Sequence, residues 1–188
     1  KPFVIIELSS LSSLFLTMSD VDSHLYVSVV SHKQDVIEFI SSFKTFDTEL
    51  SPNPSSVQLF AVNNDPWILN TTVEENILFF SPKDEEKYKK VLSISQLEPD
   101  LLTLPKGDQT EIGEKGLNLS GGQKARISIA RAIYSESDIY IFDDPLSALD
   151  AYVGMNLFKQ VFNDFLKEKT FIISTHALQY LCFFDRIL

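Results

Sequence analysis

The segment LNLSGGQKARISIARAIY, residues 117–134, combines a serine and two glycines with an apolar helical pattern. Ser120 can cap a helix that begins near Gly121, with Ile129 and Ile133 on its buried side. Free amides at a helix N-terminus attract anions, and the glycines at 121 and 122 would let a phosphate come close. The same pattern is also typical of an ordinary serine-capped helix, so this segment by itself leaves both interpretations open.

A second polar group follows an apolar strand. IYIFDD ends in Asp143 and Asp144, and carboxylates at the carboxyl end of a buried parallel strand lie where α/β folds bind ligands. One such acid commonly organises Mg²⁺ in a phosphate site, directly or through water. PLSALD, residues 145–150, and His176, just past the next strand, extend the pattern. Each of these residues alone also fits a solvated strand end or a loop.

The elements that must position these residues are predicted to form an α/β core with a helical insertion. We expect strands at 25–30, 57–62, 139–142 and 170–174, a loop at 51–56, and a helix that buries Val36, Ile37, Ile40 and Phe43. The last two strands are uninterrupted apolar runs joined by an amphipathic helix, which predicts that they are parallel. That helix is expected to bury Leu157, Phe158, Val161, Phe162, Phe165 and Leu166.

Residues 71–135 are expected to be mostly helical. Thr72 and Glu75 have the spacing of a capping box. A further helix is expected to start with Ser81 as its N-cap and Pro82 at its first position. The chain is therefore interpreted as a single domain, with a core at about 1–70 and 136–188 and a helical subdomain at about 71–135.

Composition excludes several classes. With 188 residues, 44% of them hydrophobic, the chain can bury a sizeable core, and its net charge of −10 argues against a nucleic-acid surface. Apolar runs such as FVII and ILFF have four residues, far below the ~20 that a membrane helix needs, so we expect no direct membrane insertion. One cysteine, Cys182, cannot form an internal disulfide.

Together these residues resemble the nucleotide-binding domain of ABC transporters, most specifically over residues 108–150 and further at 66–79 and 174–178. TEIGEKGLNLSGGQ and FDDPLSALD are similar to the first such domain of the multidrug-resistance-associated subfamily, subfamily C. The resemblance implies an α/β fold of the ABC type: a core like that of P-loop NTPases with a mostly parallel sheet, a helical subdomain and an N-terminal antiparallel β edge.

The resemblance also implies a membrane transporter driven by ATP and Mg²⁺. In this family two nucleotide-binding domains pack head to tail on the cytoplasmic face, below transmembrane domains. Each ATP lies between the phosphate loop of one domain and the LSGGQ signature of the other. The partners implied are therefore a second nucleotide-binding domain and the transmembrane domains of the same transporter.

Roles carry over to the matching positions of this chain. The signature residues Ser120, Gly121, Gly122 and Gln123 would meet the partner's ATP, and Leu119 and Asp150 are further candidates for nucleotide binding. Asp143 would organise Mg²⁺, and His176 would contact the γ-phosphate. Asn64 stands at the position of the family's Q-loop glutamine, three residues before Trp67.

Asp144 replaces the family's catalytic glutamate, although aspartate is usual in the subfamily's first domains. One methylene less draws the carboxylate back by about 1.5 Å. A misplacement of ~1 Å can lower a rate ~100-fold. We therefore expect little or no ATPase activity from this domain alone.

The family's phosphate loop, G-x-x-G-x-G-K-[ST], has no counterpart here. Its expected place, after the strand at 25–30, holds residues 31–36 without a glycine, and every glycine of the chain lies at Gly107 or later. Side chains then fill the space that backbone amides need around a phosphate. Asp35 would repel the anion, and no serine or threonine follows Lys33 to hold Mg²⁺.

The sequence therefore predicts a domain whose own nucleotide site is lost but which lends its signature to ATP held by a partner. Two alternatives stay open. One is an active ATPase that grips nucleotide through an atypical loop around Lys33. The other is an interaction module without enzymatic activity, or a soluble ABC protein with no transport role.

Overall fold

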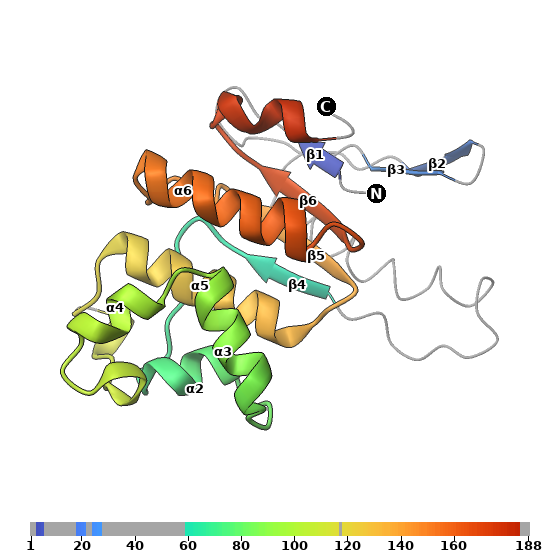
Figure 1. Cartoon of the computed structure of the whole chain (residues 1–188). Helices are drawn as coiled ribbons and strands as arrows, with labels where there is room; N and C mark the ends of the chain where they lie inside the picture. The colour runs from blue at the N-terminus through green and yellow to red at the C-terminus, as the bar shows by residue number, and fades with distance from the viewer. Residues whose placement is uncertain (1–2, 6–17, 22–23, 28–58, 117, 185–188) are drawn as a thin grey trace.

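The computed structural model describes residues 3–5, 18–21, 24–27, 59–116 and 118–184. Its main sheet has four parallel strands in the order β1-β6-β5-β4 (Figure 1). The strands are β1 (Phe3–Ile5), β4 (Leu59–Val62), β5 (Ile139–Asp143) and β6 (Thr170–Ser174). The predicted α/β class and the parallel pairing of β5 with β6 are confirmed.

A separate antiparallel pair precedes β4 in the chain. It consists of β2 (Met18–Val21) and β3 (His24–Val27), with Met18 opposite Val27. Residues 25–27 of the strand expected at 25–30 lie in β3, which pairs with β2, and residues 28–30 lie outside the described residues. Residues 28–58 lie outside the described residues, and with them the expected helix at 36–43, the loop at 51–56 and the phosphate-loop position at 31–36.

Residues 71–135 are mostly helical, as predicted. The elements are α2 (Val73–Leu78), α3 (Glu85–Ile94), α4 (Glu98–Thr103), the short 3-10 helices η1 (Gly107–Gln109) and η2 (Glu114–Gly116), and α5 (Gly121–Ser135). In Figure 1 the four α-helices lie together on the side of the sheet next to β4. The predicted capping box at Thr72 and Glu75 is present.

The predicted start of α3 is wrong. Ser81 and Pro82 precede the helix, and Asp84 is its N-cap, with Oδ1 accepting from the amides of Glu86 and Lys87 at 3.0 and 2.9 Å. The Tyr134 hydroxyl fixes this start from α5. It donates to the Pro82 carbonyl at 2.7 Å and accepts from the Asp84 amide at 2.9 Å.

The crossover from β5 to β6 changes its helical pitch. It begins as α6 (Ala151–Phe158) and continues as a π-helix, η3 (Lys159–Phe165). Five of the six apolar residues expected on one face are buried, and Phe165 is partly buried. A last 3-10 helix, η4 (Leu178–Phe183), follows β6. Of the helices that the structure describes, none combines the length and the apolar character needed to cross a bilayer.

Helix α5 is buried on almost every side, beyond the predicted face of Ile129, Ala130, Ile133 and Tyr134. It also carries a buried positive charge, because Arg131 is only 5% exposed. The guanidinium donates to the Asn76 carbonyl at 2.7 Å, to Asn76 Oδ1 at 2.8 Å and to the Trp67 carbonyl at 2.8 Å. Burial lowers the pKa of Arg131 to about 10, so the group is still charged at neutral pH.

We expect Arg131→Met to destabilise the chain by about 2–4 kcal/mol, because methionine keeps the bulk but leaves buried carbonyls without a donor. Urea unfolding measures the change. Lys89→Met, at an exposed position of α3, is the matched control and should lie within about 0.5 kcal/mol of the parent. Equal unfolding midpoints for the two variants would contradict the assigned role of Arg131.

Candidate functional site

The start of α5 has the predicted geometry. Ser120 is the N-cap, its Oγ accepts from the Gln123 amide at 3.2 Å, and its own amide donates to Gln123 Oε1 at 2.9 Å. Ser120 and Gly121 are exposed, Gly122 and Gln123 are half-buried, and Leu119 is buried in the core. The structure thus leaves the hydroxyl of Ser120 and the first turn of α5 open to solvent.

A short loop packs against this first turn. A Cβ built on Gly122 would lie 3.2 Å from the Ala148 carbonyl oxygen, whereas one built on Gly121 would lie 3.7 Å from the Ala148 side chain. Ala148 belongs to the 145–150 segment that the sequence singled out. At the end of that segment, Asp150 caps α6, since its Oδ1 accepts from the amides of Tyr152 and Val153 at 3.0 Å each.

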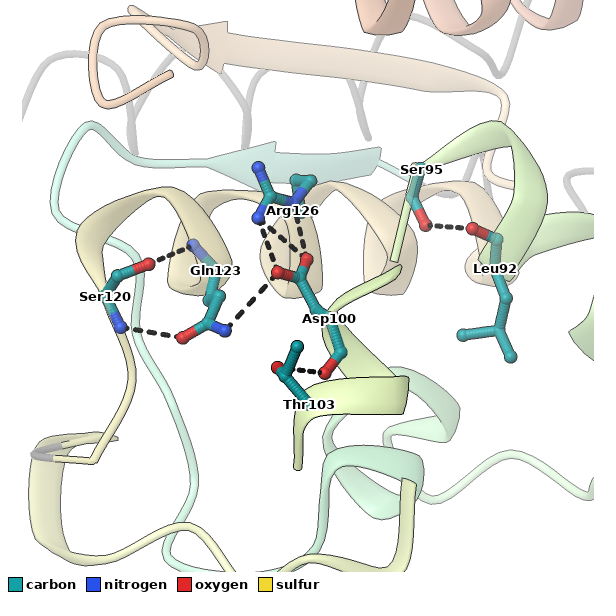
Figure 2. Close-up of polar contacts among 7 residues, drawn as sticks. All are labelled: Leu92, Ser95, Asp100, Thr103, Ser120, Gln123 and Arg126. Carbon is teal, nitrogen blue, oxygen red and sulfur yellow. Dashed lines mark hydrogen bonds and ion pairs between the residues drawn. The ribbon is translucent and has the colours of Figure 1, made fainter. Parts of the chain in front are cut away.

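The side chain of Gln123 is held from a third direction (Figure 2). Its Nε2 donates to Asp100 Oδ1 of α4 at 3.3 Å. Arg126, one turn further along α5, grips the same carboxylate through Nε and Nη2, with contacts of 2.7–2.8 Å. Sequence reasoning missed Asp100 and Arg126, because neither the spacing nor any motif links residues in α4 and α5.

The carboxyl ends of β5 and β6 bring the two acids to one edge of the sheet. Asp143 pairs with Ser174, and the Asp144 amide donates to the Ser174 carbonyl at 2.8 Å. Asp144 is buried, with a φ of 42°, a left-handed conformation that aspartate tolerates better than most residues. The Thr175 hydroxyl donates to Asp144 Oδ1 at 3.4 Å. His176 follows, with an exposed side chain.

Asn64 joins this region through Ser147. The Ser147 hydroxyl lies 3.4 Å from Asn64 Oδ1 and 2.9 Å from the Asp144 carbonyl oxygen. The structure therefore links the start of α5, the 145–150 loop, Asn64 and the acidic strand end through neighbouring contacts. Thr175 was missed by the sequence reasoning, although its place at the end of the strand beside Asp144 was a usable signal.

Metal binding at this edge would depend on few protein ligands. Among the described residues, no three His, Cys, Asp or Glu side chains converge on one metal position. Mg²⁺ in phosphate sites is typically held by one or two carboxylates and completed by phosphates and water. Asp143, half-buried at the carboxyl edge of the sheet, fits that requirement.

An exposed aromatic surface lies next to Arg131. It consists of Trp67, Phe79 and Phe80, of which Trp67 is 58% and Phe80 is 89% exposed. The Trp67 and Phe79 rings meet edge to face with centroids 6.0 Å apart, and the guanidinium of Arg131 lies 5.6 and 5.1 Å from them. Phe79 and Phe80 have φ values of 44° and 67°, so both aromatic residues sit in the strained left-handed region.

Comparisons with known proteins agree with the resemblance. A family model described as ABC transporter matches residues 28–147. The chain is 57% identical over 122 residues to ABC transporter C family member 3 of Dictyostelium discoideum, covering 65% of this chain and 9% of the relative. It is 45% identical over 159 residues to ABC transporter C family member 12 of the same organism, covering 84% and 12%.

A third relative is Multidrug resistance protein mrp-7 of Caenorhabditis elegans. The chain is 54% identical to it over 129 residues, which is 68% of this chain and 8% of that protein. The chain thus spans about a tenth of the length of these relatives.

The two glycines at the start of α5 should respond differently to alanine. Gly122→Ala forces the Ala148 carbonyl to move, and we expect it to lower the free energy of unfolding by about 1 kcal/mol. Gly121→Ala makes only an ordinary contact and should be neutral or slightly stabilising, because alanine favours the helix. Urea unfolding of both variants checks this. A Gly121→Ala variant that is the less stable of the two would contradict the packing described here.

Proposed function

This chain belongs to the ABC transporter family, and from that premise we propose that its signature segment serves ATP held by a second nucleotide-binding domain. In this proposal the chain is the first nucleotide-binding domain of a subfamily C transporter, and its own phosphate site does not work. One observation carries it: the first turn of α5 is fully assembled and exposed at Ser120 and Gly121, while residues 31–36 contain no glycine.

The chemistry of the α5 start supports this role. The oxygen of Ser120 accepts from its own helix, so its hydroxyl hydrogen can be donated outward. The first amides of a helix have no intrahelical acceptor and carry the positive end of the helix dipole. A γ-phosphate placed there meets preorganised donors, which stabilise the charge that shifts during phosphoryl transfer.

The remaining candidate residues belong to the nucleotide site of this domain itself, which lacks a glycine-rich phosphate loop. We infer that Asp143 would hold Mg²⁺, which supplies neutralisation of phosphate charge when it is bound. Asp144 stands at the place of a general base, one methylene short and held by Thr175. Asn64, beside Ser147, would contact the same nucleotide region, as would the exposed His176 and the loop that ends at Asp150. Because this site lacks a glycine-rich phosphate loop, we expect ATP to occupy it only weakly.

The aromatic surface supports a membrane-bound partner. Trp67 and Phe80 expose large apolar area, and buried hydrophobic contact with another domain would remove that area from water. We infer that the coupling helices of the transmembrane domains cover this surface, so that the domain lies on the cytoplasmic face. The whole transporter would then be the ATPase, and the isolated domain would have little or no activity.

The 188-residue chain alone should bind Mg-ATP weakly. The glycine-free segment 31–36 cannot line a phosphate with amides. Isothermal titration calorimetry should show no saturation at micromolar ATP. A low-micromolar dissociation constant would favour the alternative of an active ATPase that grips nucleotide around Lys33.

In the transporter that carries this chain, Ser120→Arg should lower ATPase activity ~100-fold or more, since it removes a donor and blocks domain closure. Lys33→Ala should leave activity nearly unchanged, because no phosphate is expected at that loop. ATPase and transport are measured at matched expression. If Lys33→Ala abolishes activity and Ser120→Arg does not, the working and lost halves are reversed. If neither matters, the chain is an interaction module.

A further inference from the structure

In the part of the chain that the structure describes, α2 and α5 start with a capping box, and the one at α5 has an additional side-chain contact. At α2, the Thr72 amide lies 3.4 Å from Glu75 Oε2, while the Glu75 amide donates to Thr72 Oγ1 at 3.1 Å. At α5, the Ser120 amide donates to Gln123 Oε1 at 2.9 Å. The α5 motif has an additional contact from a neighbouring helix, α4. There Asp100 Oδ1 accepts from Gln123 Nε2 at 3.3 Å.

This arrangement engages both polar atoms of the Gln123 side chain. Its oxygen accepts from Ser120 and its nitrogen donates to Asp100, so the side chain is held at both ends (Figure 2). Closing the capping box in turn fixes the conformation of Ser120, the residue proposed to meet the phosphate. Asp100, in α4, therefore acts on Ser120 through Gln123.

A carboxylate is an unfavourable anchor at this place. It sets a negative charge close to a helix end that is proposed to receive an anion. Arg126 compensates the negative charge of Asp100 through contacts of 2.7–2.8 Å with both of its carboxylate oxygens. The side chains of Arg126 and Asp100 are only 12% and 16% exposed, so water screens either charge weakly if its partner is removed.

We propose that Asp100 is a positioning residue for the signature serine, and that Arg126 cancels the charge that this anchor would otherwise present to the incoming phosphate. The inference rests on the proposed function, because the phosphate is the one served by Ser120. It assigns the Asp100–Arg126 pair an electrostatic role in addition to joining α4 to α5.

The two charges can be removed separately or together. Arg126→Gln leaves an uncompensated carboxylate beside the start of α5, and Asp100→Asn leaves an uncompensated cation there. The double variant Asp100→Asn/Arg126→Gln removes both charges of the pair. All three weaken the contact between α4 and α5, so all three should lower the unfolding temperature of the 188-residue chain.

The KM and kcat of the transporter's ATPase distinguish an effect of charge on ATP binding from a loss of stability. Arg126→Gln should raise the KM for Mg-ATP on the order of tenfold. Asp100→Asn should lower kcat without raising KM, because the anchor loosens while the remaining cation attracts phosphate. The double variant should return KM to within about threefold of the parent, although its stability is not restored. A KM that simply follows the unfolding temperature, with the double variant worst, would overturn the proposal.

A second measurement needs no nucleotide. In the 188-residue chain, Asp100→Ala should speed hydrogen exchange of the Ser120 amide on the order of tenfold, while the Thr72 amide of α2 serves as the internal control and stays unchanged. Equal acceleration at both amides, or none at Ser120, would refute the positioning role. Full activity of Ser120→Arg in the transporter would count against the proposed function alone, and the exchange measurement would still decide the role of Asp100.

Discussion

A buried positive charge constrains the helical part of this domain. Arg131 has lost most of its water, and neutral oxygens replace that water: two from Asn76 and the Trp67 carbonyl. Asn76 is itself fixed, because its Nδ2 donates to the carbonyls of Leu69 and Thr72. Burying a charge is tolerable only when its donors are satisfied. The segment before α2, α2 itself and α5 must therefore keep one mutual arrangement.

That constraint connects the two surfaces assigned to partners. The guanidinium lies against the Trp67 and Phe79 rings, which border the exposed aromatic surface. The same helix carries Ser120 at its start, eleven residues earlier and roughly 16 Å away along the axis. A domain that covered the aromatic surface would therefore contact rings that lie against Arg131 of α5. From Ile127 to Tyr134 α5 is buried, so its exposed first turn is carried by a helix that is packed into the core.

The parts that the sequence predicted correctly are those decided by neighbouring residues. The capping of α5 by Ser120 and the apolar runs of β5 and β6 need only local information. The start of α3 was mispredicted because the Tyr134 hydroxyl, fifty residues away, holds the chain at Pro82 and Asp84. The π-helix had no such local signal, because Phe158, Phe162 and Leu166 repeat every four residues, as apolar residues also do on an α-helix. Asp100 could not be found, since only the folded chain brings it to Gln123.

An intact signature is weak evidence for function if folding alone explains each of its residues. Gln123 closes the capping box, and Gly122 leaves room for the Ala148 carbonyl, so both have structural reasons to be present. Gly121 has no comparable reason. It is exposed, and a Cβ there would meet only the Ala148 side chain at an ordinary distance of 3.7 Å. Alanine would also favour the helix. What a glycine at this position does provide is access for an external group to the first amides of α5, which is what a phosphate held by a partner requires.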